Sequence, residues 1–323
     1  MALNKTFGID VSRWQEKMDW QKMKAHGFEF VFVRATQGIS FKDPLFATHW
    51  AGAKAAGLLR GAYHFFEPHQ DGVTQAHWFL KTLGDDFGEL PPVFDLETNQ
   101  FPLRPKPGDK VTVVDNANLV KRSAEWIKTV ETRVNRHPIM YTRARFWNDF
   151  MRDRQGQYPA WANAMKLWTA HYIFNDKEPT LDEVEKFLPF VRLPTSWPTW
   201  TFWQFTDDAK RDGLTNKDGV KSTLDINLFN GTLDELNALA AEAMPVSFST
   251  GEPAGPAFMP DVTNQEMIEA FSRAFGAGFW DIVKQAGLES MTQARDAQYS
   301  GQPVDYLPLD EVEVAKLKVA LNA

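Results

Sequence analysis

Two acidic residues that stand two positions apart are the strongest chemical signal in the sequence. Residues 91–97 read PPVFDLE, an apolar stretch of strand length. Successive side chains of a strand point to opposite faces, so Asp95 and Glu97 share a face and their Cα atoms lie about 6.6 Å apart. Carboxyl groups this close raise the proton affinity of one of them, which suits a general acid beside an ionised carboxylate. The simpler alternative is that Asp95 and Glu97 only cap the following helix.

Two other apolar stretches carry acidic residues in the same way. In FGIDV, residues 7–11, Asp10 shares a face with Gly8 and lies opposite the apolar side chains. Asp225 and Asn227 share a face further along the chain. An acidic side chain in an apolar strand costs free energy unless it is paired or used. Strand-end carboxyl groups from three distant parts of the chain predict one shared site at the end of a barrel.

The first 240 residues alternate between strand-like apolar runs and amphipathic helical stretches. The predicted strands are Phe7–Val11, Phe30–Ala35, Gly61–Phe66, Pro92–Leu96, Pro138–Tyr141, Leu167–Ala170 and Thr201–Phe205. The predicted helices between them are Asp43–Gly57, Gly72–Leu83 and Asn116–Asn135, with Asp43 and Pro44 supplying an N-cap and a first helical residue. This alternation indicates parallel βα units, and seven or eight strands favour closure into a barrel. A Rossmann fold is disfavoured because no glycine-rich loop follows the first strand.

The pattern changes along the second half of the chain. Residues 152–166 and 174–199 are rich in Pro, Trp and charge, which predicts long loops that shape a cleft. We expect a catalytic barrel over residues 1–244, a Pro- and Gly-rich linker over 245–260 and a small helical module over 261–323. That module fits either a cell-wall-binding domain or a helical unit that packs on the barrel or self-associates.

Composition excludes several classes of protein. The chain has 323 residues with a net charge of −7, which argues against a nucleic-acid partner. It contains no apolar run long enough to insert into a membrane. The absence of Cys excludes disulfides and thiolate sites, and the scattered His residues give no metal motif. The 12 Trp and 25 Phe residues exceed what a core needs and favour sugar-binding surfaces.

Seven short stretches in order carry a family resemblance. They are GIDVSRWQ at 8–15, FVFVRATQG at 30–38, GAYHFF at 61–66, VFDLE at 93–97, MYT at 140–142, LWTAHY at 167–172, and FWQFT with DINLF at 202–206 and 225–229. Together they resemble family 25 glycoside hydrolases, the Chalaropsis-type and phage or autolysin muramidases, over roughly residues 5–230. The resemblance implies an irregular TIM-like α/β barrel of five βα units followed by β-rich strands.

The resemblance also implies an activity and the residues that perform it. The expected reaction is hydrolysis of β-1,4 bonds between N-acetylmuramic acid and N-acetylglucosamine in peptidoglycan, without a cofactor or metal. Glu97 would be the general acid, Asp95 its acidic neighbour, and Asp10 part of the cleft floor. A non-catalytic glycan-binding barrel and a hexosaminidase acting on another N-acetylated glycan are the alternatives.

Further residues are expected to contact the sugars. By resemblance these are Tyr63, Tyr141, Trp168, Gln204 and Asp225, and among the tryptophans we expect Trp203 to face sugar as well. Arg34 stands where a Lys is common in the family, which leaves the details of the subsites open. The N-terminal residues MALNKTFG do not form a signal peptide. This favours an endolysin made in the cytoplasm and released to the wall, or secretion by a non-classical route.

Overall fold

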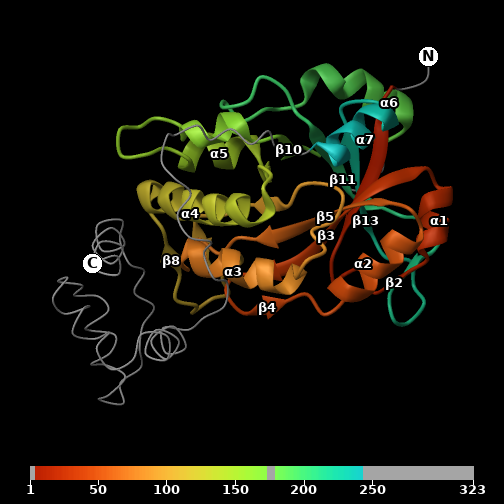
Figure 1. The fold of residues 1–323 in the computed structure, drawn as a ribbon, viewed down its shortest axis with the longest axis horizontal. Helices are drawn as coiled ribbons and strands as arrows, with labels where there is room; N and C mark the ends of the chain where they lie inside the picture. The colour runs from red at the N-terminus through yellow and green to blue at the C-terminus, as the bar shows by residue number, and fades with distance from the viewer. Residues whose placement is uncertain (1–3, 173–178, 243–323) are drawn as a thin grey trace, which may run out of the picture. The chain divides into compact units, whose positions relative to one another are not determined.

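The computed structural model describes residues 4–172 and 179–242 of the chain (Figure 1). Contacts divide the chain into two units, Met1–Val246 and Ser247–Ala323. The predicted linker and helical module, 245–323, lie outside the described residues and stay predictions. Within the described part, no helix has the length and apolar character needed to cross a membrane.

Eight strands close into a barrel. Their order around it is β1, β13, β11, β10, β9, β6, β5 and β3, and β3 pairs with β1 to complete the ring. All neighbouring pairs are parallel except those that β13 makes with β11 and β1. The barrel strands are β1 (Thr6–Val11), β3 (Phe28–Gln37), β5 (Leu59–Phe65), β6 (Val93–Asp95), β9 (Ile139–Thr142), β10 (Leu167–Ala170), β11 (Phe202–Ala209) and β13 (Leu224–Phe229). Five short strands lie outside the ring: β2 (Lys17–Met18), β4 (Phe41–Lys42), β7 (Gln100–Phe101), β8 (Thr112–Val113) and β12 (Leu214–Thr215).

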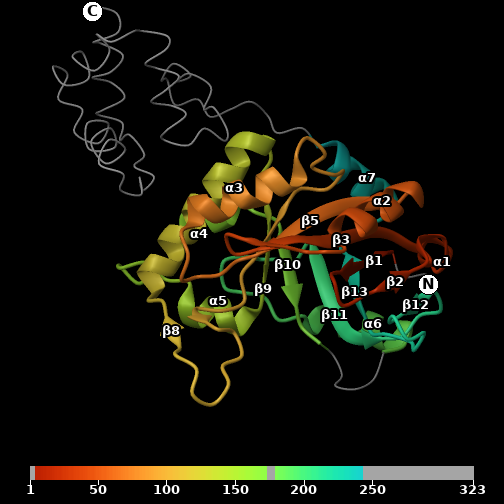
Figure 2. The ribbon, with the colours of Figure 1, turned by 90° about the horizontal axis from the view of Figure 1, so that it is seen from below.

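Helices cover the outside of the barrel. They are α1 (Trp20–Ala25), α2 (Phe46–Ala55), α3 (Gly72–Leu83), α4 (Asn116–Val134), α5 (Ala144–Phe150), α6 (Leu181–Phe187) and α7 (Leu233–Ala241), with 3-10 turns at Ala160–Ala164 and Leu188–Phe190. Five βα units come first and β-rich strands follow, as expected. Helices α3 and α4 lie side by side (Figure 2). Gly72 permits this approach, because a Cβ there would lie 2.1 Å from the carbonyl oxygen of Arg122.

Two helix predictions are corrected by the structure. Helix α2 begins at Phe46, so Asp43 is not its N-cap. Oδ1 of Asp43 accepts the backbone N–H of Leu45, just before α2, and Oδ2 accepts a hydrogen bond from Nε of the buried Arg34 at 2.9 Å, which compensates for burying that charge. Helix α6 lies within the segment expected to be loop, and Thr180 with Glu183 forms a capping box at its start.

Alternation along the strands separates two apolar layers. Phe30, Phe32 and Phe202 point into the barrel and meet edge-to-face, with ring centroids 5.2 Å apart for Phe30–Phe202 and 5.1 Å apart for Phe32–Phe202. Ile9 and Val33 belong to the outer layer, beneath the helices. Each fully buried apolar side chain stabilises the fold by about 1.5–3 kcal/mol. The filled interior leaves the strand ends as the place for polar groups.

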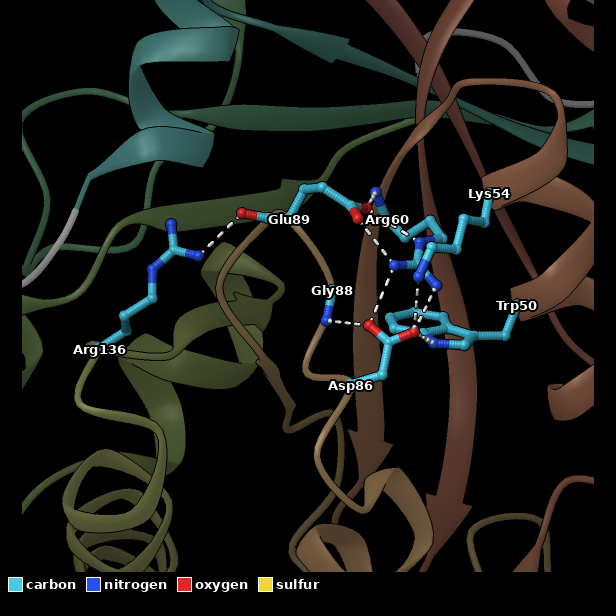
Figure 3. A network of polar contacts seen from close by, with 7 residues as sticks. All are labelled: Trp50, Lys54, Arg60, Asp86, Gly88, Glu89 and Arg136. Atoms are coloured by element: carbon cyan, nitrogen blue, oxygen red, sulfur yellow. Dashed lines mark hydrogen bonds and ion pairs between the residues drawn. The ribbon is translucent and has the colours of Figure 1, made fainter.

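A buried arginine near the start of β5 connects α2 with the loop after α3 and, through Glu89, with the loop after α4 (Figure 3). The Arg60 side chain is 1% exposed and donates hydrogen bonds of 2.7–3.0 Å to the carboxylates of Asp86 and Glu89. Its guanidinium lies 4.3 Å from the ring centroid of Trp50 on α2. Arg136 donates to the Glu89 carbonyl oxygen at 2.8 Å and so extends the network. These bonds compensate for burying the Arg60 charge.

We predict that Asp86→Asn weakens this network in a pH-dependent way. Hydrogen bonding to Arg60 lowers the pKa of Asp86 to about 2. A lowered folded-state pKa stabilises the fold above the unfolded value of about 4, and the contribution disappears as the pH falls toward 2. Asp86 is partly exposed, so we expect a loss of only about 1 kcal/mol at pH 7.

Urea unfolding of wild type and variant from pH 7 to pH 2 measures the difference between their free energies of unfolding. It should shrink between about pH 4 and pH 2. Asp85→Asn is the matched control, because Asp85 is almost fully exposed and pairs only with the surface residue Arg133. A wild-type advantage that stays constant over this pH range would contradict the prediction.

Candidate active site

Four carboxyl groups meet at one end of the barrel. Asp10 lies near the end of β1, and Asp95 and Glu97 lie at and just beyond the end of β6. Because β13 runs antiparallel to its neighbours, its start lies at this same end, and Asp225 pairs in register with Asp10. The structure thus brings together the acidic residues that the sequence predicted to share a site.

Amide side chains hold the Asp10 carboxylate in place. Its Oδ2 accepts hydrogen bonds from Nε2 of Gln204 and Nδ2 of Asn227, both at 2.8 Å. Asp10 itself is 5% exposed. Burial raises the pKa of Asp10, and the two N–H donors oppose that rise because they stabilise the ionised form.

Aromatic donors fix the orientation of both amides. The hydroxyls of Tyr141 and Tyr172 donate to Oε1 of Gln204 at 2.7 and 3.0 Å. Nε1 of Trp168 donates to Oδ1 of Asn227 at 2.8 Å. Since an indole N–H can only donate, it forces the amide nitrogen of Asn227 toward Asp10. A chain of hydrogen bonds therefore runs from the barrel interior to the carboxylate.

Asp225 behaves differently from Asp10 although the two are neighbours. Burial and the negative charge of Asp10 raise the pKa of Asp225 well above its usual value. The hydrogen bond between the two carboxyl groups raises the pKa of Asp225 and opposes the rise at Asp10. The hydrogen bond between them therefore favours Asp225 as the donor and Asp10 as the acceptor.

Asp95 and Glu97 form a second coupled pair. Burial raises the pKa of Asp95 well above its usual value, and the charge of Glu97 adds to the rise. Burial also raises the pKa of Glu97, while the positive charge of Arg143 and a hydrogen bond from Asp95 oppose that rise. Two buried carboxyl groups in contact share one proton, since ionising both costs too much. The Glu97 side chain is 20% exposed and Asp95 is buried, so Glu97 is the member that solvent reaches.

The aromatic residues predicted to contact sugar occupy three different environments. Tyr63 is half-buried beside the carboxyl groups, and burial raises its pKa well above the usual value. Trp168 is 2% exposed and stacks on Phe32 at 4.4 Å between ring centroids, so it supports the site from beneath and does not line a groove. The expectation for Trp203 is wrong: it lies in the outer layer, fully buried, and donates to the His171 carbonyl oxygen.

Three residues near the site were not predicted as part of it. Arg143 follows β9 and pairs with Glu97, and Tyr172 follows β10 and binds Gln204. Arg34 on β3 lies beside Tyr63 in the strand register, and one of its terminal nitrogens is buried without a partner. Their positions at the carboxyl ends of barrel strands were the available signal.

The comparison with protein families is consistent with this geometry. The family model described as Glycosyl hydrolases family 25 matches residues 9–214, more than half of the chain. The chain belongs to this family. It is a glycoside hydrolase, and the predicted family is confirmed.

Relatives and solved structures of the family cover the barrel. Lysozyme M1 from Streptomyces globisporus is 31% identical over 237 residues, which are 72% of this chain and 70% of that protein. The protein YegX from Escherichia coli strain K12 is 36% identical over 236 residues, 72% of each chain. The crystal structure of the bacterial lysozyme from Streptomyces coelicolor superposes with a TM-score of 0.56 at 29% identity, covering 73% of this chain and 96% of that one.

We predict that Asn227→Leu destabilises this family 25 hydrolase. The substitution removes a donor from Asp10 and leaves the N–H of Trp168 buried without an acceptor. Each buried polar group left unsatisfied costs about 1–3 kcal/mol, so we expect a loss of at least about 2 kcal/mol in the free energy of unfolding. Urea denaturation at pH 7 measures it. Asn230→Leu, at an exposed position three residues on, is the control, and equal losses in the two variants would contradict the prediction.

Proposed function

We propose that this glycoside hydrolase cleaves the β-1,4 bond between N-acetylmuramic acid and N-acetylglucosamine in bacterial peptidoglycan, with Glu97 as the general acid. The observation that carries the proposal is the placement of Asp95 and Glu97 at the end of β6, with Asp95 buried and the Glu97 side chain 20% exposed; burial raises the pKa of both. Family membership and the likeness to Lysozyme M1 support the substrate.

The geometry supplies a division of labour among the carboxyl groups. Glu97 donates its proton to the glycosidic oxygen as the bond from that oxygen to the anomeric carbon breaks. Asp95, buried beside it, keeps the proton affinity of the pair high. Asp10, ionised on the floor, stabilises the positive charge that develops at the anomeric carbon. Water then adds its hydroxyl to that carbon, and its remaining proton restores the acid.

The other site residues hold this arrangement in place. Tyr141 and Gln204 are almost fully buried, so we assign them to positioning Asp10. Tyr63 is less buried and borders the carboxyl groups, which suits a contact with the sugar whose bond is cleaved. Asp225, protonated beside Asp10, prevents a second negative charge on the floor.

We predict that Glu97→Gln abolishes peptidoglycan hydrolysis while the protein still folds. Glutamine keeps the shape of the side chain but has no proton to donate, and loss of a general acid lowers rates by about 10²–10⁴-fold. Turbidity loss of purified sacculi measures the rate, and unfolding by urea checks the fold. Glu125→Gln, on the surface helix α4, is the control.

Unchanged turnover of the Glu97→Gln variant would remove Glu97 from the acid role. Mass analysis of the digested sacculi identifies the bond. A reducing-end N-acetylmuramic acid is expected, whereas a reducing-end N-acetylglucosamine would favour the hexosaminidase alternative. No cleavage by wild type would favour a barrel that only binds glycan.

We further propose an endolysin-type role, in which the enzyme is made in the cytoplasm and lyses the cell once it reaches the wall. The proposed substrate supports this, because a muramidase acts only where it meets peptidoglycan. Expression in Escherichia coli tests it: cells should stay intact until the inner membrane is permeabilised and then lyse. Lysis without permeabilisation would contradict cytoplasmic retention and favour non-classical secretion.

A further inference from the structure

Arg143 lies against the general acid on its open side. It is the first residue after β9, and its guanidinium is 3.3 Å from Oε2 of Glu97. The same guanidinium lies 5.6 Å from the ring centroid of Tyr172. The Arg143 side chain is 51% exposed and the Glu97 side chain 20% exposed, so solvent partly screens their ion pair.

The ion pair seen here opposes the chemistry that Glu97 performs. A cation next to a carboxyl group favours its ionised form, whereas a general acid must carry a proton. Once Glu97 carries its proton, the Arg143 guanidinium is therefore available to bind another anion. Several elements contribute charged or titratable groups around Glu97. They are Asp10, Asp95, Arg104, Tyr141, Arg143, Tyr172 and Asp225.

The groups around the site carry charges of both signs. Asp10, whose carboxylate accepts the amide hydrogen bonds of Gln204 and Asn227, lies on the floor, and its negative charge repels an anionic substrate. Arg143 and the exposed Arg104 are the cations whose charge acts on Glu97. A glycan that carries a carboxylate close to its scissile bond is therefore favoured with that carboxylate toward Arg143.

We propose that Arg143 is a specificity-determining residue. When substrate binds, Arg143 breaks its ion pair with Glu97 and binds a carboxylate of the muramyl residue beside the scissile bond. This inference rests on the proposed function. Two sources supply the same chemistry: the free 3-O-lactyl carboxylate of a muramyl residue without a peptide, and the carboxylates of an attached peptide stem. A guanidinium binds either kind of carboxylate in a bidentate way, by donating two charge-assisted hydrogen bonds.

Steady-state kinetics of Arg143→Met on matched substrates tests the proposal. The first substrate is stem-free glycan strands with free lactyl carboxylates, and the second is the same strands with those carboxylates converted to methylamides. We expect the variant to lose about tenfold or more in kcat/KM on the first, mainly through KM, and less than about twofold on the second. Arg143→Lys should recover part of the loss because it keeps the charge.

Arg145→Met is the matched control, since Arg145 is two residues away and almost fully exposed. It should leave both substrates unaffected. A loss confined to intact sacculi would support the proposal with the stem as the source of the carboxylate. An equal loss of Arg143→Met on charged and amidated strands, or a loss in kcat alone, would overturn it. If wild type cleaves none of these strands, the proposed function fails.

Discussion

Carboxyl groups buried against one another cannot all ionise, and the arrangement of this end of the barrel follows from that constraint. The four groups divide into two coupled pairs, one formed by Asp10 and Asp225 and the other by Asp95 and Glu97. In the first pair, amide donors fix the ionised member. In the second, the described residues place Arg143 and Asp95 against Glu97, and burial favours a proton on the pair. The neighbours of each group thus decide whether it serves as an ionised carboxylate, like Asp10, or as a proton donor, like Glu97.

Much of the fold and of the carboxyl cluster could be predicted from the sequence. Period-two alternation placed Asp95 and Glu97 inward and Phe94 outward, and the structure has them so. Helix α3 begins and ends at the predicted residues, and α4 differs only at its last residue. These features depend on local patterns of apolar residues, which the chain shows directly.

The remainder depended on partners far apart in the chain. Alternation alone shows that Trp203 and Gln204 cannot both face the interior, yet only the buried partners of Gln204 reveal which one does. Helix α2 begins three residues after Asp43, whose carboxylate binds both the distant Arg34 and the backbone N–H of Leu45. Arg143 looks like one of many surface cations in the sequence. Its closeness to Glu97 follows from the pairing of β6 with β9, which no local pattern specifies.

Direct titration of Glu97 is the measurement closest to the central claim that two buried acids share one proton. Carboxyl-labelled protein followed by ¹³C NMR gives the protonation of each group in the resting enzyme, and the signal missing from Glu97→Gln assigns the resonance. We predict that Glu97 titrates above the usual value of about 4.3 and in two steps, because its charge is coupled to that of Asp95. A single step near about 4.3, independent of Asp95, would contradict the account.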